Sequence, residues 1–296
     1  MGFEKFIEIV REVVEERLSK RVELKVVSKN NDVKLHAIAI FDEKSNLSPT
    51  IYLEQFWEMY ERTGCLQNII DSIVQMYTRG RTEKIDMEWF TCWDKVKDKI
   101  AYKLVNREAN KELLETVPYT AYLDLAKVYY VIFDNEELGR GTITVHNNHL
   151  KMWGVTLEEL EVIAAENTPK WLPMNIITFQ EILENKGFGF ESEEEYECCE
   201  INKDFAVLTN CDKSFGAAVM CYENVIKSIA DGKESDVIII PSSIHECLVS
   251  KLEDEKDLAI LKMIVKDANE KCVLPEEKLS DSVYVYRRET DTIEIV

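Results

Sequence analysis

The stretch from Val237 to Val249 constrains the fold more than any other part of the chain. It begins with an uninterrupted apolar run, Val237 to Ile240, continues through a polar segment, and returns to apolar residues at Cys247. An apolar run without alternation is typical of a strand buried on both faces. We therefore predict a central strand at 237–240, a polar turn that begins at Pro241, and a second strand at 247–250.

Helical and extended patterns alternate along the rest of the chain. Apolar residues at helical spacing, together with capping and breaking residues, predict helices at 3–18, 55–63, 66–77, 89–100, 106–114, 156–167, 223–231 and 258–273. Short apolar, β-branched or aromatic runs predict further strands at 22–27, 33–41, 50–53, 100–105, 123–133, 141–145, 205–209, 216–222, 283–286 and 292–295. Helices and strands in this order indicate an α+β protein, with a largely antiparallel sheet in its C-terminal part.

A cluster of glutamates suggests where the chain divides. Six of the 17 residues from 187 to 203 are Glu, as expected for a solvated linker. We therefore expect an N-terminal α+β domain at 1–186, an acidic linker at 187–203 and a C-terminal α+β domain at 204–296.

The charge and apolar content exclude several classes of partner. The chain has 296 residues and a net charge of -20. Such a surface repels nucleic acid, which proteins bind mainly through Lys and Arg, so no direct nucleic-acid binding is expected. No apolar run is long enough for a membrane span, and the N-terminus has no signal-peptide core. Eight Cys without paired spacing fit reduced thiols, so we expect a cytoplasmic protein.

The polar segment between the two apolar runs holds the densest set of reactive side chains. Ser243, His245 and Glu246 lie within four residues, and Asp281, in a second polar segment, is a residue that could orient the imidazole. These four are the catalytic candidates. Against them, side chains two apart on a strand point the same way and rarely reach nucleophile–base geometry. We therefore favour a structural turn over a catalytic site.

Metal and cofactor sites find little support in the sequence. His146 and His149 are three residues apart, a spacing that can place two ligands on one helix face. No third ligand is close by, so capping is the favoured interpretation. The glycines around Arg140 lack the full phosphate-loop pattern and indicate a hairpin turn. No metal and no cofactor is predicted.

Several short motifs resemble an uncharacterised bacterial family, domain of unknown function 5688. In the C-terminal third they are Val207-Leu208-Thr209-Asn210, Gly216-Ala217-Ala218, the segment Ile240 to Glu246, and the segment Leu279 to Tyr284. In the N-terminal part they are Ile51-Tyr52-Leu53, Leu104-Val105-Asn106 with Asn110, Leu123-Asp124-Leu125, and Trp153-Gly154-Val155-Thr156. Cys247 departs from the Val expected after Ile-His-Glu. The architecture is also similar, more weakly, to the uncharacterised YtpQ-like family. Neither resemblance implies an activity.

These observations lead to one functional expectation and two alternatives. We expect a non-catalytic protein-interaction or regulatory module whose partner is another protein. The first alternative is a hydrolase or nucleotide-dependent enzyme centred on His245, with Ser243, Glu246 and Asp281 as its helpers. The second is an acidic DNA-mimic inhibitor of a basic nucleic-acid-binding protein, which requires acids at phosphate-like spacing on one face.

Overall fold

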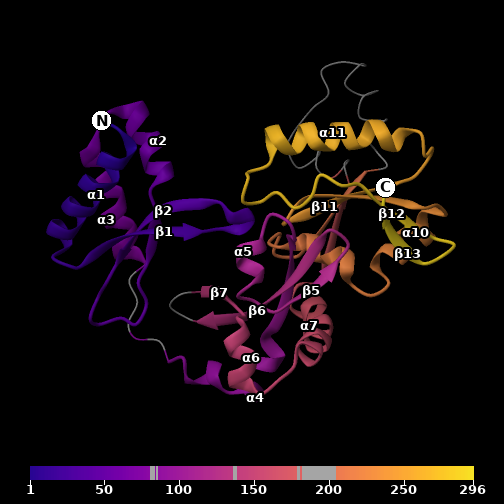
Figure 1. The fold of residues 1–296 in the computed structure, drawn as a ribbon, viewed down its shortest axis with the longest axis horizontal. Helices are drawn as coiled ribbons and strands as arrows, with labels where there is room; N and C mark the ends of the chain where they lie inside the picture. The colour runs from indigo at the N-terminus through magenta and orange to yellow at the C-terminus, as the bar shows by residue number, and fades with distance from the viewer. Residues whose placement is uncertain (81–83, 85, 136–138, 179–180, 182–204) are drawn as a thin grey trace. The chain divides into compact units, whose positions relative to one another are not determined.

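The chain forms two compact units. The computed structural model describes residues 1–296 apart from 81–83, 85, 136–138, 179–180 and 182–204 (Figure 1). The first unit contains residues 1–92 and 133–141, and the second contains 93–132 and 142–296. The α+β class is confirmed, because helices accompany three sheets whose named strand pairs are antiparallel.

The predicted linker 187–203 lies outside the described residues. Strands β8 (Met174–Thr178) and β9 (Ala206–Asn210), which lie before and after it in the chain, pair in one sheet. Both strands therefore belong to the second unit. The compact units divide the chain near residue 92, and the predicted domains 1–186 and 204–296 stay a prediction.

The first unit packs helices against a three-stranded antiparallel sheet. Its elements are α1 (Phe3–Leu18), β1 (Val22–Ser28), η1 (Asn30–Asp32), β2 (Lys34–Ile40), β3 (Thr50–Tyr52), α2 (Glu54–Thr63), α3 (Leu66–Arg79) and η2 (Glu88–Thr91). The predicted stripe of α1 is buried, with Phe6, Val10 and Val14 fully enclosed in a core shared with the sheet. Gly64, in the left-handed region at φ 65°, ends α2 as predicted.

The second unit contains two sheets. Its elements before β8 are α4 (Trp93–Val96), η3 (Lys97–Lys99), β4 (Ile100–Asn106), α5 (Lys111–Leu114), β5 (Tyr119–Tyr122), most of β6 (Leu125–Asn135), the second half of β7 (Gly139–Thr144), α6 (Asn147–Trp153) and α7 (Leu157–Trp171). The end of β6 and the start of β7 belong to the first unit, which includes residues 133–141. Those after β9 are η4 (Gly216–Cys221), α10 (Val225–Lys233), β10 (Val237–Ser243), β11 (Glu246–Lys251), α11 (Asp257–Cys272), β12 (Tyr284–Arg287) and β13 (Thr292–Ile295). The smaller sheet has the order β4-β6-β5, with β7 also on β6.

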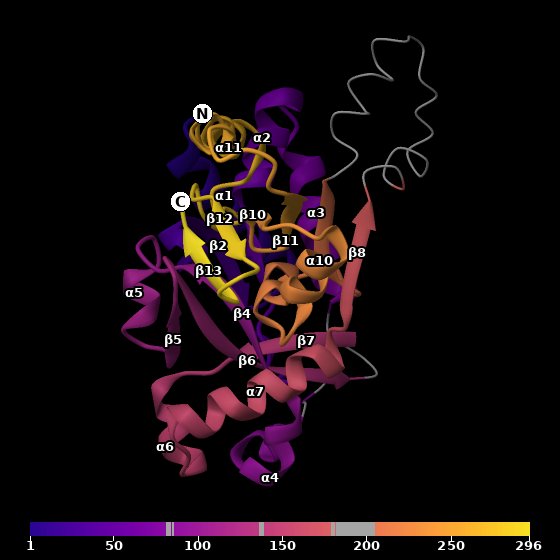
Figure 2. The ribbon, with the colours of Figure 1, turned by 90° about the vertical axis from the view of Figure 1, so that its right-hand side faces the viewer.

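The larger sheet confirms the predicted central strand. The strand order of this sheet is β13-β12-β10-β11-β9-β8 (Figure 2). β10 is therefore an inner strand, and β13 and β8 are the edge strands of the sheet. Ile238 and Ile240 alternate along β10 and share a core with Leu258 and Val265 of α11. This helix covers one face of the sheet (Figure 1). None of the helices in the described parts of the chain is long and apolar enough to cross a membrane.

Two predicted elements differ in the structure because tertiary contacts override local pattern. Residues 216–221 were expected to be extended but form the 3₁₀ helix η4, whose Gly216 backbone packs closely against Thr209 and the His245 carbonyl. The predicted helix at 89–100 is a series of shorter pieces, η2, α4 and η3. Strands β5 and β8 were not predicted, since neither segment has a long apolar run.

One helix starts, and another ends, at a different residue than predicted. Asn106 does not cap a helix: it is the last residue of β4, and α5 starts five residues later with Asn110 at its cap position. Pro169 does not end α7, which continues to Trp171. Hydrogen bonds to η3 stabilise the last turn of α7. Asn167 donates to the Lys97 carbonyl at 2.8 Å, and the Trp171 indole donates to the Asp98 carbonyl at 2.7 Å.

Candidate functional site

Ser243 and His245 lie at the turn between β10 and β11, and each has a structural partner. The Ser243 hydroxyl accepts from the His245 backbone N–H at 3.1 Å. The imidazole Nδ1 accepts from the Phe215 N–H at 3.3 Å, the rings of these two residues stack 6.0 Å apart, and Nε2 lies 3.6 Å from the Glu277 carboxylate. Serine thus contacts the backbone of His245 and not its ring. These contacts hold the β10–β11 turn in place and form no nucleophile–base pair.

Asp281 belongs to a segment that packs beside this turn, but its carboxylate has other partners. Backbone bonds bring the two polar segments side by side, since Leu279 N–H donates to the Ser242 carbonyl at 3.2 Å and Ile244 N–H donates to the Glu277 carbonyl at 2.8 Å. The Asp281 carboxylate pairs with Lys278 at 2.7 Å and accepts from the Asn269 amide at 2.9 Å. Glu246 faces Ser243 across the β10–β11 ladder. The predicted segments therefore meet without assembling a serine–histidine–aspartate relay.

A different carboxylate, Asp124, organises the second polar segment. The hydroxyls of Ser280 and Ser282 donate to its Oδ2 at 2.6 and 3.0 Å, and the Tyr284 hydroxyl donates to its Oδ1. Burial, followed by the bond to Asp124, raises the pKa of Tyr284 well above its usual value. Asn106 adds a bond to the Leu279 carbonyl at 2.9 Å. This cluster fastens the smaller sheet to the larger one.

Asp124 was not among the predicted site residues, although it stood within one of the family motifs. A lone acid between two leucines ahead of an apolar strand is the signal that could have identified it. Its partners lie about half the chain away: Ser280 is separated from Asp124 by 156 positions. The separation hides the cluster from local motif analysis.

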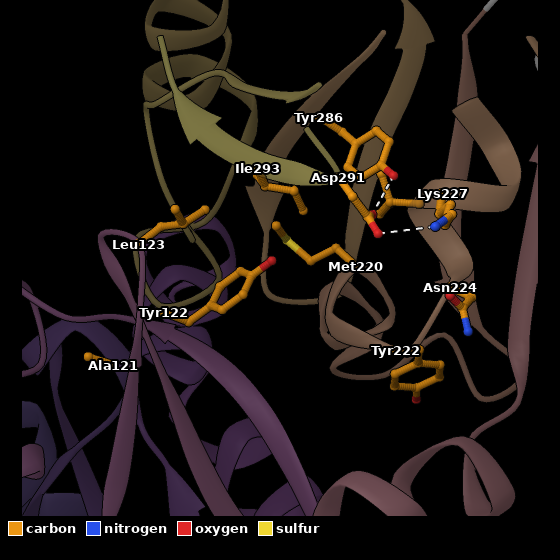
Figure 3. Close-up of a pocket in the computed structure, with 11 residues that line it drawn as sticks. Ala121, Tyr122, Leu123, Met220, Tyr222, Asn224, Lys227, Tyr286, Asp291 and Ile293 are labelled. Carbon is orange, nitrogen blue, oxygen red and sulfur yellow. Dashed lines mark hydrogen bonds and ion pairs between the residues drawn. The ribbon is translucent and has the colours of Figure 1, made fainter. Parts of the chain in front are cut away.

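The second unit also contains an open cleft of about 390 Å³. Four segments line it: the end of β5 with the turn before β6, the end of η4, the start of α10, and the β12–β13 hairpin (Figure 3). The lining residues are Ala121, Tyr122, Leu123, Met220, Tyr222, Asn224, Ile226, Lys227, Tyr286, Asp291 and Ile293. Neither His245 nor Asp281 is among them, so the cleft is separate from the predicted site.

An ion pair closes the polar end of this cleft. Lys227 donates to Asp291 Oδ2 at 3.1 Å, and the Tyr286 hydroxyl donates to Oδ1 at 2.6 Å (Figure 3). The hydrogen bond from Tyr286, followed by the one from Lys227, lowers the pKa of Asp291. Burial and the same bond raise the pKa of Tyr286 to about 12. Asp291 therefore stays ionised at neutral pH, and Tyr286 stays protonated.

The histidine pair caps a helix in the structure. The His146 N–H donates to Nδ1 of His149 at 3.1 Å at the start of α6, as the capping interpretation expects. Burial, and secondarily His146, lowers the pKa of His149. Within the described part of the chain, no group of three or more His, Cys, Asp or Glu side chains is arranged to hold a metal ion.

One helix face exposes apolar side chains. The inner face of α11 is buried through Leu258 and Val265, whereas Ile260, Met263 and Ile264 are 61%, 74% and 58% exposed. These three residues, here called the outer row, have the i, i+3, i+4 spacing that places side chains on one face. Lys262 and Lys266 are also exposed on this helix.

Comparison with known proteins identifies a family but no activity. A family model described as "Family of unknown function (DUF5688)" matches residues 3–288, which is nearly the whole chain and confirms the predicted membership. The weaker similarity to the YtpQ-like family is not confirmed. No curated protein and no solved structure matches the chain.

Proposed function

We propose that this protein, which belongs to the DUF5688 family of unknown function, is a non-catalytic interaction module of the bacterial cytoplasm. It binds a partner protein through the outer row of α11. The observation that carries the proposal is the row itself: Ile260, Met263 and Ile264 are each more than half exposed on a helix whose opposite face is already packed. Contiguous apolar side chains on a surface mark interaction sites more often than scattered ones do.

The energetic reason is the burial of apolar area. Fully burying one side chain of this size contributes about 1.5–3 kcal/mol. The sheet cannot supply this burial, because α11 already turns Leu258, Val265 and the buried Asn269 towards it. A partner that covers the outer row buries apolar area that the described part of the chain leaves exposed.

Charge indicates the chemistry of the partner. Lys262 and Lys266 lie on the flank of the outer row next to Met263, and no ion pair is found for either with a described residue. Unpaired lysines beside an apolar row favour a partner with carboxylates at matching places. The net charge of -20 disfavours a second copy of the chain. We therefore infer an amphipathic helix with acidic flanks as the docking element of the partner.

Site-specific photo-crosslinking tests this proposal in a native bacterial lysate. A benzophenone side chain replaces Met263 in one full-length protein and Glu166, an exposed residue of α7 in the same unit, in the control. We expect one crosslinked protein from position 263 that is absent from position 166. Mass spectrometry should locate the crosslink in a helix with acidic flanks.

Charge reversal separates specific docking from nonspecific adhesion. Lys262→Glu with Lys266→Glu should lower the crosslink yield at position 263, whereas Lys151→Glu with Lys170→Glu, on exposed residues of α6 and α7, should leave it unchanged. Equal crosslinking from positions 263 and 166 would contradict the proposal. So would a crosslink only to a second copy, to the chain's own first unit, or to a basic nucleic-acid-binding protein, the last of which would support the DNA-mimic alternative.

A further inference from the structure

The cleft lined by β5, η4, α10 and the β12–β13 hairpin has the size of a small-molecule site. Its volume of about 390 Å³ falls in the range of roughly 300–1,000 Å³ that is usual for such sites. Met220 and Ile226 form a buried apolar base, and Leu123 and Ile293 add apolar surface nearer the opening. Figure 3 shows the side chains of Met220 and Ile293 close to one another. The interior therefore suits an apolar group of modest size.

Three tyrosines line the cleft, and the hydroxyls of two of them are already engaged. The Tyr222 hydroxyl donates to the Leu172 carbonyl at 2.9 Å, and the Tyr286 hydroxyl donates to Asp291 at 2.6 Å. Burial keeps all three tyrosines neutral by raising their pKa values. The rings of Tyr222 and Tyr286 can therefore contact an aliphatic or aromatic group without leaving a hydroxyl unsatisfied.

The polar end of the cleft offers one positive and one negative group. The side chains of Lys227 and Asp291 are 47% and 58% exposed, and their ion pair is 3.1 Å long. An exposed pair of this kind contributes about 1 kcal/mol or less, so a ligand can replace it at little cost. Asn224 lies beside Lys227 at the start of α10, where the helix dipole also favours an anion.

We propose that this cleft binds a small zwitterion with an apolar side chain, the chemistry of a free apolar α-amino acid. The ligand's carboxylate pairs with Lys227, and its ammonium pairs with Asp291, which Tyr286 holds in place. The ligand's side chain lies against Met220 and Ile293. The site is separate from the outer row of α11, and the inference does not depend on the proposed protein partner.

Ligands of other charge fit these groups less well. A simple anion would pair with Lys227 but face Asp291, and a simple cation would pair with Asp291 but face Lys227. Only a molecule that carries both charges close together satisfies both groups at once. Polyphosphates need several cationic groups, and Lys227 is the single Lys or Arg among the residues that line the cleft.

Calorimetric titration of the full-length protein tests the inference. The probes are L-leucine, L-methionine and L-phenylalanine, with phenethylamine and 3-phenylpropionate as analogues that keep the apolar group but lose one charge. At least one amino acid should bind with a Kd of about 1 mM or tighter. Each singly charged analogue should bind at least about tenfold more weakly than L-phenylalanine.

Variants place the binding in the cleft. Asp291→Asn and Lys227→Met should each weaken amino-acid binding by at least about tenfold. Glu289→Gln, an exposed acid in the same hairpin loop, and Lys262→Met, on α11, should leave the Kd unchanged. Ligand addition should also shift the methyl NMR signal of Met220, which reports on the cleft even if one variant folds poorly.

Three results would overturn the inference. The first is no binding by any of the three amino acids at concentrations of about 10 mM. The second is a singly charged analogue that binds as tightly as the amino acid with the same side chain. The third is amino-acid binding that persists unchanged in both Asp291→Asn and Lys227→Met.

Discussion

Replacement of Asp124 by Ala removes the shared acceptor of three hydroxyl groups in the second unit. Tyr284 is fully buried and Ser280 is 2% exposed, so neither hydroxyl can turn to water, whereas the partly exposed Ser282 can. Ser280 Oγ still accepts from the Ser282 N–H at 2.9 Å, but both O–H donors lose their acceptor. A buried donor left without an acceptor costs about 1–3 kcal/mol, so the two together cost about 4 kcal/mol. We therefore expect Asp124→Ala to lower the free energy of unfolding of the second unit by about 4 kcal/mol.

A double-mutant cycle with Tyr284→Phe sharpens this expectation. In the wild-type background Tyr284→Phe removes a hydrogen bond to a charged acceptor and should cost about 2 kcal/mol. In the Asp124→Ala background it removes a hydroxyl that has already lost its partner, so it should be neutral or stabilising. The sign change distinguishes a hydrogen-bonded cluster from a simple loss of packing volume.

Urea unfolding with hydrogen-exchange mass spectrometry measures the stability loss in Asp124→Ala and the cost of Tyr284→Phe in each background. Two units can unfold separately, so exchange must be followed in the peptides of β6 and β12. Glu166→Ala, at an exposed position of α7, is the matched control and should shift stability by less than about 0.5 kcal/mol. A structural role of Asp124 as shared acceptor is excluded if Asp124→Ala behaves like this control, or if Tyr284→Phe costs the same in both backgrounds.

Two further sites give predictions with internal controls. At Gly216 an added Cβ would lie 2.1 Å from Thr209 Oγ1 and 2.4 Å from the His245 carbonyl, so Gly216→Ala should cost about 3 kcal/mol in thermal or urea unfolding. Gly232 has open space in α10, so Gly232→Ala should stabilise by about 0.5–1 kcal/mol, and equal effects at the two glycines would contradict this reasoning. Burial lowers the pKa of His149 in the folded chain, so the unfolded chain binds the proton more readily and stability should fall as pH drops through about 6.5. His149→Gln should flatten this dependence and Lys151→Gln should not, as unfolding curves at several pH values would show; an unchanged slope in His149→Gln would refute the assignment.

Local chemistry is enough to predict the regular elements. The apolar stripe of residues 3–18 corresponds to α1, and the capping box of Thr156 with Glu159 forms at the start of α7 with bonds of 3.2 and 2.9 Å. These features depend on residues three or four apart, which the sequence displays directly. The hairpin of β12 and β13 follows the same logic, since Asp291 adopts the left-handed turn conformation at φ 56°.

The elements that differ depend on distant packing. The segment Gly216 to Cys221 has the composition of a strand but lies so close to β9 and the turn after β10 that a 3₁₀ helix forms instead. Short strand β8 forms through its pairing with β9, a strand that follows much later in the chain. No window of local sequence contains either constraint.

The candidate sites also combine residues that the sequence reveals with partners that only the fold brings together. The sequence identifies Ser243, His245 and Asp281 by chemical type, but the partners that determine their roles come from elsewhere, as Phe215 does for the imidazole and Asn269 for the carboxylate. The cleft is assembled from four separate segments and has no motif of its own. Its charge pair becomes visible only when α10 and the last hairpin are placed together.

The most direct test of the proposed function is the crosslink yield at position 263 when the rest of the outer row is made polar. Ile260→Ser with Ile264→Ser removes burial that is worth about 1–2 kcal/mol for each side chain, since the partner can cover only the exposed 61% and 58%. Both positions are more than half exposed, so circular dichroism and thermal unfolding should match the wild type. We expect the yield of the crosslinked partner to fall by at least about tenfold. An unchanged yield from a folded variant would contradict docking through α11.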